Sequence, residues 1–436
     1  MSSTRTTNEQ PFLERIGVPM ILIWGFAGVF LFMIGDGVES NYLAPYFKDH
    51  FGFSETGAAN VILFYGVFVA IGSYLAGTLS SFFGPKRVMV VGAIFWGVFE
   101  ALFLLVALPS KNHTLIYACY GVRGVGYPLF AFAFLTWINL AVDRERRGRA
   151  SGWFWFAFTG GLPVVGSAIA AATIPVVGER GTFFIAWGLV MSGGVLGLLA
   201  CRERHGTERI IEQDGHQVTA AEELRSSISI LWRNPLIGLA TGLRTINTGA
   251  QYGFFVALPF FLEKQIGFSQ TQYLWLIVLT FGANVVMNPI SGLLSDRFGW
   301  RRSIQWLGGV GCTITTLLMY LVPKAAGHDF VVVGLIGILY GITLAGYVPL
   351  SAFMPTVVAE SDRGNAMAMY AFAAGFSTVV GPLVFRALDP SFGIAGVMYV
   401  FAALYLVSAV GAHWLVHDSD PGEAETTRAT PAISTG

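Results

Sequence analysis

The sequence predicts an all-α polytopic membrane protein, with twelve transmembrane helices arranged as two six-helix repeats. Of its 436 residues, 54% are apolar and only 12% are charged, whereas a soluble domain carries about 25% charged residues. Apolar segments long enough to cross a bilayer recur along the whole chain. Short signatures of the first half recur in the second. We therefore expect most of the surface to face lipid.

The charge balance and the cysteines exclude several classes of function. Lys plus Arg and Asp plus Glu number 26 each, so net charge gives no indication of a nucleic-acid partner. Cys119, Cys201 and Cys312 lie in or beside apolar segments far apart in the sequence, which is typical of small core residues and not of a metal site or a disulfide framework. No nucleotide-binding loop or hydrolase motif is present. We expect neither an enzyme nor a bound metal or cofactor.

Apolar segments of at least about 18 residues predict the transmembrane helices. They lie near residues 18–46, 57–82, 87–108, 113–142, 151–174, 182–201, 235–262, 271–294, 303–323, 330–358, 366–388 and 394–416. The first segment follows a polar tail, is longer than a signal-peptide core and has no small-residue cleavage site after it. We expect it to be a retained helix.

The distribution of Lys and Arg predicts that both termini are cytoplasmic, because these residues concentrate in the N-terminal tail, the central polar stretch and every second connection. In that central stretch, Thr219 and Glu222 have the spacing of a capping box that begins a helix. A solvated connector is favoured there over a regulatory module. The expected parts are a cytoplasmic tail at 1–17, a six-helix bundle at 18–201, a cytoplasmic linker at 202–234, a second bundle at 235–416 and a disordered cytoplasmic tail at 417–436.

The two halves share signatures at matching places, which indicates an internal duplication. The matching pairs are residues 52–56 with 267–271, Gly77 with Gly292, Gly84 with Gly299, and 120–127 with 340–347. Two parallel six-helix repeats with a ligand site between them, near the bilayer midplane, are the architecture of rocking secondary transporters.

Two carboxylates in the outer half of the first apolar segment predict a functional site. A charged side chain at this depth costs about 3 kcal/mol on insertion scales. Asp36 and Glu39 are three residues apart and share one helix face. Gly35 and Gly37 remove side chains beside Asp36, which predicts a loosened helix with room for a protonatable group.

Arg123, in the fourth helix, lies at about the same depth as Asp36. A neighbouring guanidinium favours the ionised form of a carboxyl group, whereas burial and a second carboxylate favour the protonated form. We therefore expect Asp36, Glu39 and Arg123 to bind and release a proton during transport. The alternative is a permanent ion pair that only holds the first and fourth helices together.

Polar and aromatic residues predict a substrate site. Arg244, Asn247 and Gln251 follow one another at three- and four-residue steps, near one face of the seventh helix. Amides can bind hydroxyl groups and aromatic faces can pack on C–H edges, although each Trp can equally serve the lipid belt or helix packing. The further expected substrate contacts are Asn284, Tyr127, Trp96, Trp153 and Trp155. Glu100, toward the outer end of the third helix, either faces a water-filled vestibule or takes a direct role.

Residues 292–302 (GLLSDRFGWRR) have the form of a cytoplasmic gating motif that the major facilitator superfamily carries twice. The residues that define it are Gly292, Asp296, Arg297, Gly299, Arg301 and Arg302. A carboxylate at a helix end can pair with nearby Arg residues when the inner gate is shut and separate when it opens; charge topology alone is the alternative. In the first copy, Ser81 stands at the position of the acid.

The sequence resembles the polyol permease branch of that superfamily, the ribitol and D-arabinitol transporters, over nearly the whole chain. The stretches that carry the resemblance are 35–39 (GDGVE), 120–124 (YGVRG), 127–130 (YPLF) and 152–155 (GWFW). The resemblance implies proton-coupled uptake of a pentitol across the bacterial inner membrane. It also implies that Asp36 and Arg123 match the helix-1 acid and helix-4 arginine that couple protons in the sugar carriers of the superfamily.

We therefore expect a proton:polyol symporter that works by alternating access as a monomer, with a small neutral polyol as substrate and a proton as coupling ion. The alternatives are a proton-coupled transporter of an organic acid, in which Arg123 or Arg244 binds a carboxylate, a transporter of another small solute, or a facilitative uniporter. A drug antiporter is disfavoured because residues 160–163 (GGLP) lack a direct Gly-Pro step. A non-transporting sensor would need a partner-binding module in the linker, which has no compact apolar core.

Overall fold

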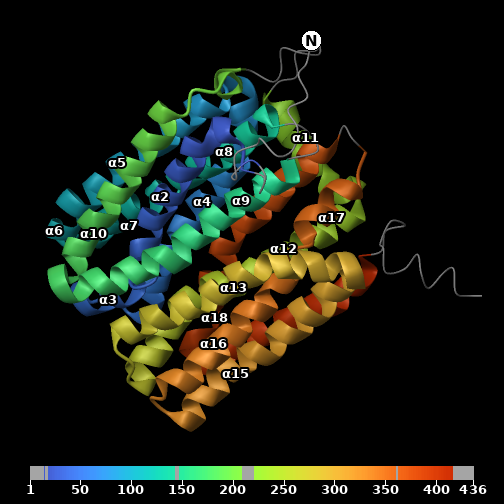
Figure 1. Ribbon diagram of the computed structural model, residues 1–436. Helices are drawn as coiled ribbons and strands as arrows, with labels where there is room; N and C mark the ends of the chain where they lie inside the picture. The colour runs from blue at the N-terminus through green and yellow to red at the C-terminus, as the bar shows by residue number, and fades with distance from the viewer. Residues whose placement is uncertain (1–13, 15–17, 143–146, 209–219, 360–361, 416–436) are drawn as a thin grey trace, which may run out of the picture. The chain divides into compact units, whose positions relative to one another are not determined.

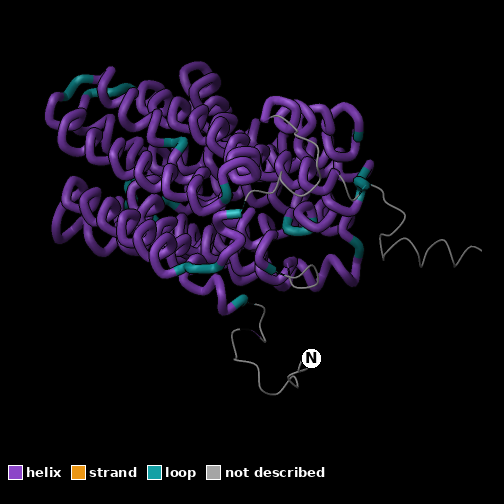
Figure 2. Tube along the Cα trace, turned by 90° about the horizontal axis from the view of Figure 1, so that it is seen from above, coloured by secondary structure: helices purple, strands orange, loops and turns teal. Residues whose placement is uncertain are grey.

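The computed structural model describes residues 14, 18–142, 147–208, 220–359 and 362–415. This part of the chain is helical throughout and has no strand; Figure 1 labels the helices, and Figure 2 shows them joined by short loops. Of the predicted N-terminal tail at 1–17, only Glu14 is described. The predicted C-terminal tail at 417–436 lies outside the described residues, as does Thr219 of the predicted capping box.

Within the described ranges, nine helical stretches are long and apolar enough to cross a membrane. Two of them, Ala150–Ala200 and Arg363–Trp414, have 51 and 52 residues. Each is divided into two spans by a glycine with non-helical backbone angles, Gly178 or Gly393. The remaining predicted span is α12 (Pro235–Pro259), which carries several polar residues. The predicted twelve-helix fold is confirmed.

The described residues form two compact units. Unit 1 holds those of 1–40 and 71–220, and unit 2 holds those of 41–70 and 221–436. Residues 41–70 therefore belong by their contacts to unit 2, whereas the predicted bundle boundaries of 18–201 and 235–416 follow chain order and stay a prediction. Within unit 2, Lys264 Nζ donates to Asp49 Oδ2 over 2.7 Å, and Thr378 Oγ1 donates to the Gly66 carbonyl over 3.1 Å.

Unit 1 is built around two groups of packed helices: α2 packs on α10, and α5 packs on α7 and α8. Its elements are η1 (Met20–Leu22), α2 (Ile23–Ser40), α5 (Pro85–Leu102), η2 (Phe103–Ala107), α6 (Leu108–Ser110), α7 (His113–Arg123), α8 (Gly126–Ala141), α9 (Arg147–Thr159), η3 (Gly160–Val165), α10 (Gly166–Ala200) and η4 (Arg204–Thr207). The helix α4 (Glu55–Phe83) runs through both units.

Glycines let the helices of unit 1 approach one another closely. A Cβ atom on Gly28 would lie 2.5 Å from Gly197 Cα, one on Gly35 would lie 2.6 Å from the Ala186 carbonyl oxygen, and one on Gly37 would lie 1.9 Å from the Leu162 carbonyl oxygen. Small residues at helix crossings allow such contacts in membrane proteins. Since α2 is continuous through Gly35 and Gly37, the prediction that they loosen the helix was wrong: their role is close packing.

Unit 2 is built in the same way, with α12 packed on α18 and α13 packed on α16. A Cβ atom on Gly381 would lie 2.3 Å from the Gly253 nitrogen. The elements are α3 (Leu43–Phe51), α11 (Ala220–Arg233), α12, η6 (Phe260–Ile266), α13 (Gln270–Phe298), α14 (Trp300–Arg302), η7 (Ser303–Val310), α15 (Gly311–Ala326), α16 (Phe330–Leu344), η8 (Ala345–Tyr347), α17 (Leu350–Thr356), α18 (Arg363–Gly411) and η10 (Ala412–Trp414).

The backbone repeats the duplication that the sequence predicts. Three pairs of glycines have φ between 61° and 97°, and the two members of each pair are the same number of residues apart. The pairs are 52 with 267, 84 with 299 and 178 with 393. These angles favour glycine because an L side chain is strained there. The same turns therefore end the same helices in both halves.

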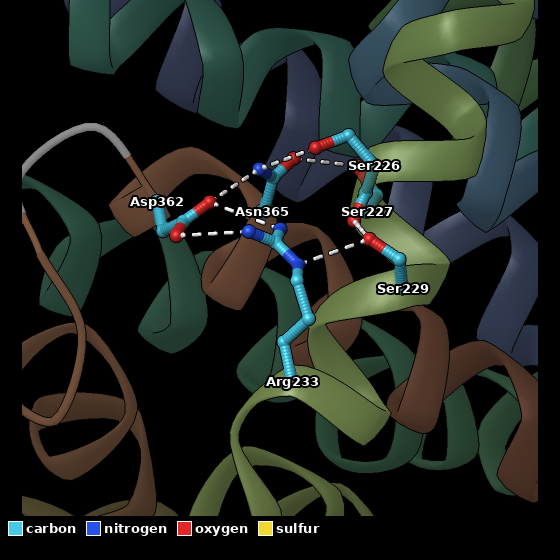
Figure 3. A network of polar contacts seen from close by, with 6 residues as sticks. All are labelled: Ser226, Ser227, Ser229, Arg233, Asp362 and Asn365. Carbon is cyan, nitrogen blue, oxygen red and sulfur yellow. Dashed lines mark hydrogen bonds and ion pairs between the residues drawn. The ribbon is translucent and has the colours of Figure 1, made fainter.

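The second half of the predicted linker is a helix docked on unit 2. Figure 3 shows Asn365, near the start of α18, between α11 and Asp362. Ser227 Oγ donates to Asn365 Oδ1 over 2.8 Å, and Asn365 Nδ2 donates to Ser226 Oγ over 3.2 Å and to Asp362 Oδ1 over 3.0 Å. Arg233 Nη2 lies 3.3 Å from Asp362 Oδ1. This part of the linker is a packed element and not a free connector.

We predict that Asn365→Ala releases α11 from unit 2. The change removes three hydrogen bonds, each worth roughly 0.5–1.5 kcal/mol, so trypsin should cleave at the exposed Arg225 at least about ten times faster than in the wild type. Ser192→Ala is the matched control, since Ser192 is exposed and bonds only the Gly188 carbonyl of its own helix. Equal cleavage rates for the wild type and Asn365→Ala would contradict the anchoring role.

We also predict that Gly37→Ala disrupts unit 1, because the added methyl group meets the Leu162 carbonyl. Overpacking of this kind costs about 1–3 kcal/mol or more. Gly188→Ala is the control, since a Cβ there meets nothing within 4 Å. Thermal unfolding in detergent should show a lower Tm for Gly37→Ala and an unchanged or higher Tm for Gly188→Ala. A Tm for Gly37→Ala equal to that of the control would refute the packing argument.

Candidate functional site

A buried charge cluster in unit 1 joins α2, α5 and α7. The guanidinium of Arg123, the last residue of α7, forms ion pairs with Glu39 of α2 and Glu100 of α5. All three side chains are 0% exposed. A charge in such a place is costly unless it is paired, so three helices are held together by one cation.

Two aromatic rings flank the guanidinium. The Arg123 Cζ atom lies 4.6 Å from the Trp96 ring centroid and 4.3 Å from that of Tyr120, which are cation–π distances. Trp96 Nε1 also donates a hydrogen bond to Asp36 Oδ1 over 2.9 Å. Trp96, predicted as a substrate contact, is thus fully buried in the charge cluster.

The local backbone explains this arrangement. After Arg123 the chain tightens, with bonds from the Gly124 and Val125 amides to carbonyls three residues earlier, and α8 then begins at Gly126. A Cβ on Gly126 would lie 2.5 Å from Trp96 Cβ. The glycine therefore lets the start of α8 lie against α5 at the position that carries Trp96.

The sequence predicts that Asp36, Glu39 and Arg123 act together, and the structure places them in one cluster. The ion pairs described for Arg123 are with Glu39 and Glu100, while Asp36 accepts the bond from Trp96. Glu100 was expected toward the outer end of its helix, facing a vestibule or taking a direct role; it is buried in the cluster. The signal that could have found it is its four-residue spacing from Trp96, which places both on one face of α5.

The cluster holds three carboxyl groups for one guanidinium, and each of the three is at most 2% exposed. An ionised carboxylate without a counter-ion in such a place costs several kcal/mol. A proton on one of these carboxyl groups removes part of that cost. The arrangement is therefore chemically suited to bind and release a proton.

The other predicted substrate residues of unit 1 lie in an aromatic cluster. The Trp155 and Tyr127 rings lie 5.5 Å and 6.1 Å from the Phe158 ring, and the Trp153 ring lies 5.3 Å from that of Phe156. Tyr127 is buried, whereas Trp153 and Trp155 are partly exposed. The structure therefore brings Tyr127 and Trp155 together around Phe158, while Trp153 packs on Phe156.

In unit 2 the corresponding region is a neutral hydrogen-bond network with one cation. Arg244 Nη1 donates to Asn247 Oδ1 over 2.7 Å, and Arg244 Cζ lies 4.8 Å from the Tyr370 ring centroid. Tyr405 donates to the Asn247 carbonyl over 3.1 Å, and its hydroxyl lies 2.8 Å from that of Tyr340. Tyr340 is the sequence match of Tyr120, so a neutral tyrosine network stands where unit 1 has its charges.

Two other predicted substrate residues lie nearby in the fold of unit 2. Gln251 is on α12, one turn beyond Asn247, and is partly exposed. Asn284 is buried on α13, where its Nδ2 donates to the Gly341 carbonyl of α16 over 3.1 Å. The Asn284 side-chain amide therefore joins α13 to α16 in this structure.

The predicted gating motif spans the end of α13 and the start of α14. Gly292 and Arg297 lie on α13, Gly299 turns the chain with φ 92°, and Arg301 and Arg302 lie on α14. The side chain of Asp296 lies outside the described part of the structure. The gating role therefore stays a prediction.

The first copy of this motif lacks the acid but has a carboxylate from elsewhere beside it. Lys86 Nζ donates to the Cys201 carbonyl over 2.8 Å, and Trp137 Nε1 donates to Glu203 Oε2 over 2.6 Å. Burial raises the pKa of Glu203, but hydrogen bonds from the His205 amide, from Trp137 and from the His205 side chain outweigh it and bring this pKa below its usual value. Glu203 thus provides an ionised group at this end of unit 1.

Comparisons with known proteins cover almost the entire chain. The family profile described as Major Facilitator Superfamily matches residues 25–343 and 240–434. The chain is 37% identical to an alpha-ketoglutarate permease of Bacillus subtilis (strain 168), over 91% of this chain and 89% of that protein. It is 33% identical to a D-arabinitol transporter of Klebsiella pneumoniae (91% of this chain, 92% of that protein) and 31% identical to a ribitol transporter of the same organism (90% and 91%).

Among solved structures, a D-xylose–proton symporter is similar in fold. It superposes with a TM-score of 0.70 at 16% sequence identity, and the alignment covers 91% of this chain and 97% of that one.

Proposed function

The chain belongs to the major facilitator superfamily and is an integral membrane transporter of a small solute, not an enzyme; on this premise we propose that it is a proton-coupled symporter of a sugar alcohol such as D-arabinitol or ribitol. Uptake by alternating access follows from this proposal. So does placement in the bacterial cytoplasmic membrane with both termini inside, which the distribution of basic residues supports. We expect the monomer to be the working unit.

The observation that carries proton coupling is the surplus of buried carboxyl groups over guanidinium in unit 1. Asp36, Glu39 and Glu100 share one environment with Arg123. Water that enters the cluster stabilises the ionised carboxylates, whereas a dry cluster favours a bound proton. A cluster that is alternately wet and dry can therefore take up a proton and release it.

The charges also favour a neutral substrate. The guanidinium of Arg123 is already paired with two carboxylates, so it does not need a substrate carboxylate to balance it. The surplus of acid repels an anion. The relatives named D-arabinitol and ribitol transporters support a neutral polyol. The hydroxyl groups of a polyol would bind the amide and hydroxyl side chains that come after Arg244 on α12.

An organic acid is the second candidate, because two observations favour it. One relative is named alpha-ketoglutarate permease. Arg244 is bonded to a neutral amide and lies over an aromatic ring, an arrangement that can also accept a carboxylate. In that case Arg244, and not Arg123, would be the group that binds the substrate.

The direct test measures the pH of a weakly buffered suspension of de-energised cells that express the protein. Symport removes protons from the medium, so D-arabinitol or ribitol should make it more alkaline. Asp36→Asn should abolish accumulation and leave exchange partly intact, whereas Asp49→Asn, on the exposed surface of α3, should keep both. A signal with alpha-ketoglutarate and none with polyols would establish the acid, and a polyol that enters without a pH change would indicate a uniporter.

We predict that Gln251→Ala chiefly weakens the apparent affinity for the polyol. The loss of one hydrogen bond to a neutral group costs roughly 0.5–1.5 kcal/mol, so the half-saturation concentration should rise about three- to tenfold. Gln265→Ala, an exposed position on η6, should leave it unchanged. An unchanged half-saturation with an altered pH profile would instead move Gln251 from solute binding to coupling.

A further inference from the structure

We propose that the exposed face of α11 lies in the headgroup layer of the membrane and binds anionic phospholipids of the cytoplasmic leaflet. The sequence predicts a solvated connector at this place, yet the helix is docked by one face on the rest of unit 2 and carries apolar side chains on the other. This placement is independent of the proposed solute and of proton coupling. Only the name of the leaflet rests on the proposed orientation of the chain.

The two faces of α11 have different surroundings. Ser227 and Ile230 are buried, and Figure 3 shows Ser227 beside the start of α18. Arg225, Ile228 and Trp232 are exposed, and their spacing of three and four residues places them together on the other face. Trp232 is 74% exposed and Ile228 is 41% exposed. Apolar and basic side chains on one exposed face are typical of a helix that lies in a membrane interface.

The junction with α12 sets the level of this face. The helix α11 ends at Arg233, and the span α12 begins at Pro235. A Cβ atom on Gly238 would lie 2.8 Å from the Leu231 carbonyl oxygen, so the last turn of α11 lies against the first turn of α12. Since α12 is a membrane span, Trp232 lies where this span leaves the hydrocarbon. That is the layer in which tryptophan is enriched in membrane proteins.

Other exposed tryptophans of unit 2 lie at the same end of the spans. Trp306 of η7 is 64% exposed and Trp414 of η10 is 60% exposed, and these two elements pack on one another. Successive spans run in opposite directions, so η7 after α13 and η10 after α18 come at the same end of unit 2 as α11 before α12. Trp232 therefore belongs with an aromatic belt at one membrane surface.

Basic side chains make this surface suited to anionic headgroups. The exposed arginines at this end of unit 2 are Arg225, Arg233, Arg297 and Arg302. Glu222 is also exposed, but it lies one turn farther from α12 than Arg225 does. The attraction of one basic residue to an anionic membrane surface corresponds to about a fivefold change in occupancy. Arg225 and Trp232 share a face, so together they offer a phospholipid one charged and one apolar contact.

A spin label at residue 228 tests the placement and leaves Trp232 and Arg225 unchanged. The native cysteines are buried, so Ile228→Cys can be labelled selectively in vesicles of phosphatidylglycerol and phosphatidylethanolamine. Oxygen, which dissolves in lipid, should relax this label more strongly than a water-soluble nickel complex does. The excess should be smaller than at Val286→Cys, a reference position on α13 that is 67% exposed. Stronger relaxation by nickel would place the face in water, and protection from both reagents would show that protein covers it; either result overturns the proposal.

The same label tests the role of lipid charge. In phosphatidylcholine vesicles, added phosphatidylglycerol should move the label from nickel-accessible to oxygen-accessible. Arg225→Gln should raise the mole fraction of phosphatidylglycerol at the midpoint about fivefold, and Arg225→Lys should restore the wild-type midpoint. Arg180→Gln, at an exposed position of unit 1, is the control and should leave the midpoint unchanged. A label that does not respond to phosphatidylglycerol, or equal midpoints for the wild type and Arg225→Gln, would refute the binding of anionic lipid.

Discussion

The burial of one arginine is the constraint on which unit 1 depends. A guanidinium cannot be deprotonated in a protein, so Arg123 carries its charge into the interior of the bundle and requires partners there. These partners come from two other helices, Glu39 on α2 and Glu100 on α5, and the rings of Trp96 and Tyr120 flank the guanidinium. To remove Arg123 would leave its buried carboxylates without their counter-ion, and breaking a buried pair in this way costs about 3–5 kcal/mol. Under the proposed symport, stability and proton chemistry therefore share the same atoms.

Close helix crossings make this cluster possible. Without side chains at Gly28, Gly35 and Gly37, α2 lies directly against α10 and η3, and Gly126 brings α8 against α5. At each of these crossings, an added Cβ atom would lie less than 3 Å from an atom of the neighbouring helix. The carboxylates are consequently held by helices and not by loops, which the proposed symport requires of a group that binds a proton reversibly.

Much of this fold could be predicted from the sequence, because lipid imposes long apolar segments and a duplication leaves matching motifs. The twelve spans and the meeting of Asp36, Glu39 and Arg123 followed from these signals. Glu100 was misjudged because depth along a helix does not say which face meets a neighbour. The role of Gly35 and Gly37 was misread for a similar reason: a glycine that admits a neighbouring backbone and a glycine that loosens a helix look alike in sequence. The pairing of Trp96 with Asp36 depends on a crossing between distant segments, for which no local pattern exists.

The two halves share their turns but not their titratable groups. Unit 1 has three acids around Arg123, whereas the matching region of unit 2 has the neutral Tyr340, Tyr405 and Asn247 network. Under the proposed symport, this asymmetry limits the energy available for each solute molecule to what one cluster can carry. One elementary charge moved across 100 mV is worth about 2.3 kcal/mol, and about 1.4 kcal/mol corresponds to a tenfold concentration ratio. A cell that uses a single proton per molecule can therefore concentrate a neutral solute roughly 40-fold for each 100 mV of protonmotive force.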